Sequence, residues 1–139
     1  MTSIAALSAQ YPLWLCDVWG VIHNGHDVFA PACEALAMHR TCGGISLLLT
    51  NSPRSRAGVA RQLRELGVPD ESYSAIVTSG DVTQELLRQH ARGKVYHLGP
   101  TRDLSIFEGQ ALERAPLEEA HAVLCTGLVN DLSETPADY

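Results

Sequence analysis

The chain has 139 residues, of which 45% are hydrophobic and 19% are charged, and this composition excludes a disordered chain. The formal net charge of -6 argues against a nucleic-acid partner, because phosphate backbones attract basic protein faces. It does not exclude a small phosphorylated substrate, since a local site can be positive on an acidic protein.

Cysteine spacing and the N-terminal segment bear on the compartment. The four cysteines do not form a C-x-x-C pair, so neither a zinc knuckle nor a thioredoxin-type motif is predicted, and reduced thiols fit the cytoplasm. The N-terminal segment has no basic residue before its apolar stretch, which argues against a signal peptide. No apolar run reaches the roughly 20 residues of a membrane span. We therefore predict a cytoplasmic protein without a membrane partner, and the oligomeric state stays open.

Short apolar runs alternate along the chain with stretches of helical periodicity. The runs cover residues 13–18, 45–50, 75–78, 94–98 and 121–125. Because they are nearly continuous rather than alternating, they predict strands of a parallel sheet with helices on both faces.

The segments between these runs predict helices. One covers residues 31–40, a second begins at Ser52 and Pro53 and ends at Gly67, and a third begins near Ser79 or Asp81 and ends at Gly93. Strands and helices in this order predict βαβ units with right-handed crossovers, and hence an α/β, Rossmann-like fold.

Polar residues stand where the first three predicted strands end. Asp17 belongs to the end of the first strand, Thr50-Asn51-Ser52 to the second and Thr78-Ser79-Gly80 to the third. Ligands of such sheets bind beyond the carboxyl ends of the strands. We expect these three strands to be parallel, with the Asp17 strand next to the Thr50 strand.

The residue types at these strand ends allow phosphoryl chemistry. A carboxylate such as Asp17 can act as a nucleophile that carries a phosphoryl group, or it can simply cap the following loop; taken alone, the residue favours the cap. A hydroxyl before a helix start is a ready anion site. Arg54 and Arg56 place positive charge at that predicted start, which indicates an anionic partner, although for Arg56 we prefer a side chain that points into water.

These residues also carry a family resemblance. The run Asp17-Val18-Trp19-Gly20-Val21 resembles motif I of the haloacid dehalogenase-like hydrolase superfamily, whose usual form is D-x-D-G-T/V, and LLLTNSPR resembles motif II. The order of segments is similar to that of class IIA, the branch with a C2-type cap that includes sugar-phosphate and nucleotide phosphatases. The resemblance implies that residues 1–139 are a partial core domain, that 126–139 lead into a cap, and that the cap and the C-terminal half of the core are absent.

The resemblance implies a phosphohydrolase for a small phosphorylated metabolite. Asp17 would form an aspartyl-phosphate, Thr50 would hydrogen-bond the transferring phosphoryl group, and Mg²⁺ would bind the Asp17 carboxylate and the backbone carbonyl of Trp19. The remaining residues expected to contact the substrate are Gly20, Asn51, Ser52 and Arg54. The loop from Gly20 to Gly25 would form a flap over the substrate.

Two departures from the family pattern change the expectation for activity. Trp19 replaces the aspartate that acts as the general acid and base, and indole cannot supply that proton; His23 in the flap is a possible substitute. The motif III lysine and motif IV acidic pair of the family are not found, so we expect the fragment itself to be inactive. The alternative is a catalytically degenerate domain that binds a phosphorylated ligand or a protein partner.

Aromatic and histidine side chains near Asp17 leave further alternatives. Trp19 can be a stacking surface for the substrate or a plug at the strand end, and the sequence does not favour either. His23 and His26 could bind a transition metal, but their Asn-Gly turn setting favours ordinary loop residues.

Overall fold

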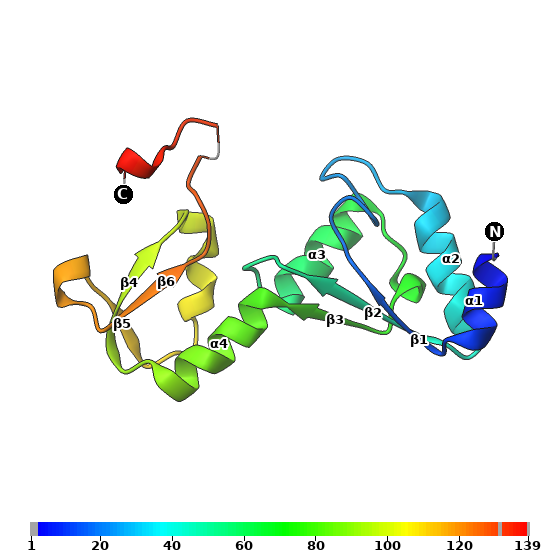
Figure 1. Cartoon of the computed structure of the whole chain (residues 1–139), viewed down its shortest axis with the longest axis horizontal. Coiled ribbons are helices and arrows are strands. Elements are labelled where there is room, and N and C mark those ends of the chain that lie inside the picture. The colour runs from blue at the N-terminus through cyan, green and yellow to red at the C-terminus, as the bar shows by residue number, and fades with distance from the viewer. Residues whose placement is uncertain (1–2, 131, 139) are drawn as a thin grey trace. The chain divides into compact units, whose positions relative to one another are not determined.

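The computed structural model describes residues 3–130 and 132–138 (Figure 1). The chain divides into two compact units, one made of Met1–Ser52 with Arg56–Ser79 and the other of Pro53–Ser55 with Gly80–Tyr139. Each unit has its own three-stranded parallel sheet and its own hydrophobic core. The α/β class and the parallel strands are therefore as predicted, but the strands form two sheets rather than one.

The first unit carries the predicted βαβ units. Its elements are α1 (Ile4–Gln10), β1 (Leu13–Cys16), α2 (Ala30–Thr41), β2 (Ile45–Thr50), α3 (Arg56–Leu66), the 3-10 turn η1 (Asp70–Ser72) and β3 (Ala75–Thr78). The strand order is β1-β2-β3, and both pairings are parallel. Cys16 pairs with Leu48, and Thr50 pairs with Thr78. The prediction of three parallel strands, with the Asp17 strand beside the Thr50 strand, is confirmed.

One face of this sheet packs against α2 and α3. Leu48 from β2 and Ile76 from β3 form a buried cluster with Leu36 from α2 and with Val59 and Leu63 from α3. Both helices lie on the same face because the strand order runs in one direction and right-handed crossovers then place each helix on the same side.

The other face of the same sheet is apolar but exposed. Its side chains belong to the alternate positions of the strands, and the exposed large ones are Leu13, Leu15, Ile45, Leu49 and Val77. Helices were expected on both faces of the sheet. The helices of this unit cover one of the two faces. Successive side chains of a strand point to opposite faces of the sheet. A continuous apolar run therefore gives both faces apolar side chains.

Helix α3 begins later than the sequence predicts. Its first residue is Arg56, four residues after Ser52, and it follows Ser55, a residue type that also favours the N-cap position. Ser52 therefore does not cap this helix, and Arg54 precedes the helix instead of standing in its first turn.

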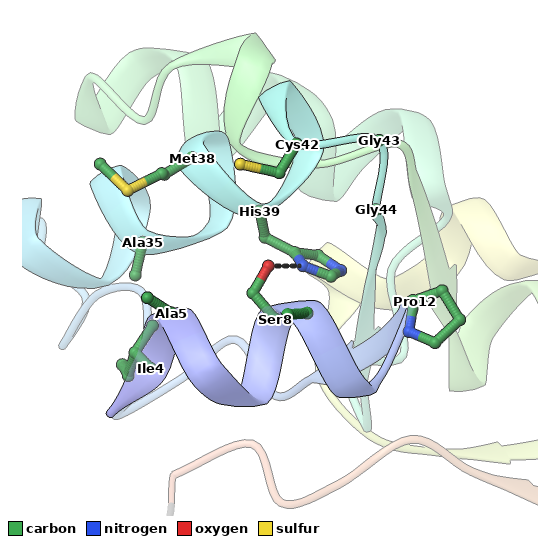
Figure 2. A pocket seen from close by; sticks show the side chains of 11 residues that line it. Ile4, Ala5, Ser8, Pro12, Ala35, Met38, His39, Cys42, Gly43 and Gly44 are labelled. Atoms are coloured by element: carbon green, nitrogen blue, oxygen red, sulfur yellow. Dashed lines mark hydrogen bonds between the residues drawn. The ribbon is translucent and has the colours of Figure 1, made fainter. Parts of the chain in front are cut away.

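Helix α1, which the sequence analysis did not predict, packs against α2 (Figure 2). Ser3 caps it by accepting a hydrogen bond from the backbone N–H of Ala6 at 3.2 Å. The hydroxyl of Ser8 and Nδ1 of His39 share a hydrogen bond of 2.7 Å. The His39 ring stacks on Trp14 of β1, with ring centroids 4.1 Å apart. These contacts tie the N-terminal helix to the covered side of the sheet.

The second unit contains most of α4 (Ser79–His90) and the strands β4 (Gly93–Leu98), β5 (Leu112–Arg114) and β6 (Ala122–Cys125). Between and after the strands lie the 3-10 helices η2 (Thr101–Phe107), η3 (Leu117–Glu119) and η4 (Pro136–Asp138). The strand order is β5-β4-β6, and the pairings are parallel. The core consists of Leu87, Val95, Ile106 and Leu124.

The predicted runs 94–98 and 121–125 are strands of this second sheet, as expected, whereas β5 was missed. Its sequence, Leu-Glu-Arg, is too short and too polar to show a strand pattern. That residues 126–139 lead into a cap stays a prediction; the described part of them belongs to the second unit, and Asp131 and Tyr139 lie outside the described residues. Among the described residues, no helix has the length and apolarity needed to cross a membrane.

Candidate active site

The first sheet has an open cavity of about 740 Å³ at the carboxyl ends of its strands. Its lining residues are Leu15, Asp17, Leu49, Thr50, Asn51 and Ser79. They come from the end of β1, from the end of β2 and from the residue that follows β3. Parallel pairing brings these three strand ends to one edge of the sheet, so residues far apart in the sequence share one cavity.

Asp17 stands directly after β1 with its side chain exposed. Its Oδ1 accepts a hydrogen bond from the backbone N–H of Val18 at 2.7 Å, which orients the carboxylate. Among the described residues, Asp17 is the only carboxylate that lines the cavity. This local hydrogen bond is of the capping kind predicted for Asp17 taken alone. The position of Asp17 in the cavity leaves its carboxylate accessible to a ligand.

The neighbouring thiol of Cys16 is not an activated nucleophile. Burial, with the negative charge of Asp17 and the nearby Cys33 adding to it, raises the pKa of Cys16 above its ordinary value. Because the thiolate is the reactive form of cysteine, a raised pKa keeps Cys16 unreactive near neutral pH.

Thr50 and Asn51 form the part of the cavity contributed by β2. Thr50 is 8% exposed, and its hydroxyl oxygen accepts a hydrogen bond from the backbone N–H of Ser52 at 3.2 Å. That bond leaves the hydroxyl proton available for an acceptor such as a phosphate oxygen. Ser52 itself is not among the lining residues.

Ser79 adds a second hydroxyl residue to the cavity. Its position at the end of the third strand is as predicted, but Ser79 is not one of the predicted site residues. The available signal was its position: it follows β3 directly, as Asp17 follows β1. The structure brings it to the same cavity as Asp17 and Thr50.

The loop after Asp17 is held by a network of its own. The backbone N–H of Gly20 donates to the carbonyl of His23 at 2.7 Å, and Gly20 has a φ of +80°, which favours glycine. Nδ1 of His23 accepts from the backbone N–H of Gly25 at 2.9 Å. His23 is 3% exposed, and burial lowers its pKa. His23 is therefore a buried histidine that organises the loop, and this position does not suit the proton donor that was considered for it.

Trp19 and Arg54 do not line the cavity. Trp19 is 66% exposed, which does not fit a plug at the strand end, and the stacking surface stays a prediction. Gly20 is likewise outside the lining residues. Arg54 belongs to the second compact unit.

The donor atoms of the cavity fit a weakly held Mg²⁺ at most. Mg²⁺ prefers six oxygen ligands, keeps several waters and is usually anchored by one or two carboxylates. Asp17 offers one carboxylate here. Among the described residues, no cluster of three or more His, Cys, Asp or Glu side chains could hold a metal ion, which also argues against a site at His23 and His26.

Comparison with known proteins identifies the family. The profile of a family described as haloacid dehalogenase-like hydrolase matches residues 14–113, a span that includes both resembling motifs, the strands β2 and β3 and all of β1 except Leu13. The chain belongs to this family, and the identification made from the sequence is confirmed. No curated protein matches the chain significantly.

Solved structures agree with this assignment. A haloacid dehalogenase-like hydrolase from Brucella suis 1330 is 44% identical, with a TM-score of 0.93 over 100% of this chain and 53% of that one. A possible sugar phosphatase from Cytophaga hutchinsonii is 20% identical, with a TM-score of 0.77 over 91% of this chain and 48% of that one. The 4-nitrophenylphosphatase from Thermotoga maritima is 23% identical, with a TM-score of 0.64 over 89% and 46%. The chain thus spans about half the length of these proteins.

Proposed function

We propose that this chain is part of a phosphohydrolase that acts on a small phosphorylated metabolite, with Asp17 as the nucleophile. The observation that carries the proposal is the cavity that joins the Asp17 carboxylate to the Thr50 hydroxyl at the carboxyl edge of a parallel sheet. Membership of a hydrolase family and structural similarity to proteins named as phosphatases support it.

In the proposed reaction, one carboxylate oxygen of Asp17 attacks the phosphorus of a phosphate monoester, and the bond from phosphorus to the ester oxygen breaks. The alcohol leaves with the electron pair and takes a proton from water, and an aspartyl-phosphate remains on Asp17. A water molecule then attacks this phosphorus, which releases inorganic phosphate and restores the carboxylate. Thr50, Asn51 and Ser79 would orient the phosphoryl oxygens, and the neighbouring Ser52, Gly20 and Arg54 remain proposed substrate contacts.

Charge is the main obstacle for the isolated chain. Two like charges about 4 Å apart repel by about 4 kcal/mol at an effective dielectric of about 20. The proposed Mg²⁺, held by the Asp17 carboxylate and the Trp19 carbonyl, would reduce this repulsion when bound. Since the cavity offers one carboxylate and no lysine, we propose that the 139-residue chain alone is inactive and that activity needs further residues of a longer protein.

Trp19 sets the expected substrate preference. General acid and base catalysis contributes about 10²- to 10⁴-fold, and neither indole nor the buried His23 supplies it here. We therefore propose that the active protein favours esters whose leaving oxygen needs no protonation, such as aryl phosphates. The same observation supports the second candidate function, a degenerate domain that binds a phosphorylated ligand without turning it over.

The experiment compares the longer protein with its Asp17→Asn variant on an aryl phosphate and an alkyl phosphate, with Mg²⁺ and with EDTA. Asp27→Asn is the matched control, because Asp27 is an exposed aspartate of the adjacent loop that does not line the cavity. We expect Asp17→Asn to abolish turnover and Asp27→Asn to preserve it, with aryl phosphates preferred. Turnover that survives Asp17→Asn would refute the nucleophile, and phosphate binding without turnover would favour the degenerate domain.

The compartment and the partner classes complete the proposal. All four cysteines are free thiols, which supports a reducing compartment such as the cytoplasm. The acidic net charge supports a small-molecule partner in preference to a nucleic acid.

A further inference from the structure

A second cavity, of about 350 Å³, lies between α1 and α2 (Figure 2). Its wall includes Pro12 and Gly44, which directly precede β1 and β2. It therefore lies at the amino ends of these strands, whereas the cavity of Asp17 lies at their carboxyl ends. Sites for small molecules have volumes of about 300–1,000 Å³, so this second cavity is large enough to hold a ligand of its own.

The wall of the second cavity is mostly apolar. Ile4 and Ala5 of α1 and Ala35 and Met38 of α2 line it, and among the described residues no Lys, Arg, Asp or Glu side chain does so. Arg40, in the last turn of α2, donates to backbone carbonyls of η1. Because a buried charge without a partner is costly, this wall favours a neutral ligand over a phosphorylated one.

One nitrogen atom in the wall has no hydrogen-bond partner. His39 lines the cavity and is 1% exposed, and its Nδ1 shares a hydrogen bond of 2.7 Å with the hydroxyl of Ser8. Its Nε2 is buried, and no described residue makes a hydrogen bond to it. A buried polar atom that stays unpaired costs stability, so Nε2 is the point at which a ligand in this cavity gains a hydrogen bond.

The hydrogen bond to Ser8 decides which chemical group suits Nε2. The Ser8 hydroxyl can donate or accept, so the neutral imidazole of His39 can carry its proton on either nitrogen. Nε2 needs an acceptor in one tautomer and a donor in the other. A hydroxyl group supplies both, whereas a carbonyl oxygen supplies only an acceptor and an ammonium group only a donor.

The imidazole ring of His39 is held in place by its neighbours. One face stacks on Trp14, with ring centroids 4.1 Å apart and the planes at 9°. Gly44 packs close to the ring, because an added Cβ there would lie 2.2 Å from Nε2. Gly43 and Gly44 form this part of the wall, and glycine backbone is free enough to shift when a hydroxyl group reaches the nitrogen. A ring that is already positioned lowers the entropy cost of binding.

We propose that this cavity binds a small neutral molecule, the size of a single aromatic ring, whose hydroxyl group pairs with Nε2 of His39. The apolar part of the ligand contacts Ile4, Ala35 and Met38. The site is separate from the candidate active site, because the two cavities share no lining residue. The inference therefore goes beyond the proposed function and does not rest on it.

The first test compares the binding of phenol and of toluene to the 139-residue chain, measured by chemical shift changes of the backbone amides. The two probes have the same number of heavy atoms and differ in one hydroxyl group. We expect phenol to bind at least about fivefold more tightly, which is the effect of one neutral hydrogen bond. His39→Phe keeps an aromatic ring beside Trp14 but removes Nε2, so it should abolish the preference for phenol.

The thiol of Cys42 reports whether the cavity is occupied. Cys42 is exposed and lines the cavity, whereas Cys125 is an exposed thiol of the second unit. Phenol should slow the alkylation of Cys42 by iodoacetamide and leave the rate at Cys125 unchanged. Phenyl phosphate at the same concentration should slow neither reaction, because its charge has no partner in this cavity.

A cavity-filling pair of variants tests the location without changing His39. Ala5→Leu should weaken the binding of phenol by at least about tenfold, because Ala5 lines the cavity. The matched control is Ala6→Leu, since Ala6 is an exposed alanine of the same helix that does not line the cavity. Leucine is a good helix former, so both variants should keep the far-ultraviolet circular dichroism of the parent chain.

Several results would overturn the proposal. These are a lack of phenol binding, equal affinity for phenol and toluene, protection of Cys42 by phenyl phosphate, and binding that ignores Ala5→Leu. A Cys42 thiol that is already shielded in the longer protein without a ligand would also overturn it, because another segment would then fill the cavity. Asp17→Asn should leave phenol binding unchanged, so failure of this inference and failure of the proposed activity are distinguishable.

Discussion

The two faces of the first sheet have similar side chains and very different surroundings. Leu48 is fully buried beneath α2 and α3, while Leu49, the next residue of β2, is 48% exposed. The two leucines are equally suited to a core. What separates them is the handedness of the crossovers, which places both helices on the side of Leu48.

This difference shows that a strand with apolar side chains on both faces is not always buried on both faces within its own unit. The nearly continuous apolar run Ile45–Thr50 is typical of a strand that is buried on both faces. Within the first unit, one face is satisfied by local βαβ connections between neighbouring strands. The other face stays exposed in this unit.

The largest expected effect comes from exchanging the two neighbouring leucines for alanine. Leu48→Ala should lower the free energy of unfolding of the first unit by about 2–5 kcal/mol, because it leaves a cavity in the buried cluster. Leu49→Ala should change it by less than about 0.5 kcal/mol in the free chain. Urea unfolding followed by tryptophan fluorescence measures this unit, since Trp14 and Trp19 both belong to it. Equal losses for the two variants would show that the exposed face of the first sheet is covered in solution.

A smaller loss of stability is expected from a substitution at Gly44, in the turn that follows α2. A Cβ added at Gly44 would lie 2.2 Å from ring atoms of His39, and that ring is fixed between Ser8 and Trp14. Gly44→Ala should therefore destabilise the first unit by about 1–3 kcal/mol. In a His39→Ala background the same substitution should cost far less, because the ring is gone. A double-mutant cycle in urea measures this coupling, and additive effects would mean that the two residues do not collide.

The smallest effect concerns pH and the buried His23. Burial lowers its pKa below the ordinary 6.5, so the folded state holds this ring neutral more strongly than the unfolded chain does. The contribution of the neutral His23 ring to stability is therefore fully present above a pH of about 6.5, and it is lost as the pH falls through the lowered pKa. Loss of the Nδ1 acceptor for Gly25 on protonation acts in the same direction.

The measurement is urea unfolding by tryptophan fluorescence at a series of pH values from neutral to mildly acidic. His23→Asn, whose amide oxygen can still accept a hydrogen bond, should flatten the decline. His26→Asn is the matched control, because His26 is an exposed histidine of the same loop, and it should keep the decline of the parent. A decline that is the same in all three proteins would assign the pH dependence to other groups.

The sequence located most of the first unit because its signals are local. Apolar runs and helical spacing give α2, β2 and β3 to within a residue or two, and strand-end residues give Asp17 and Thr50. Signals that depend on context were misread or missed. Ser52 looked like a helix cap, but Ser55 offers the same chemistry nearer to the helix, and nothing in the sequence chooses between them.

By itself, then, the sequence determined the family, the order of strands and helices from β1 to β4, and the kinds of residue that follow the first three strands. These depend on residue type and short-range period. Only the tertiary structure decided that Ser79 shares a cavity with Asp17, that His23 is buried, that Trp19 is exposed, and that a second sheet separates from the first. It also decided which face of the first sheet is covered, because handedness and long-range packing belong to the fold as a whole and leave no mark on any single strand.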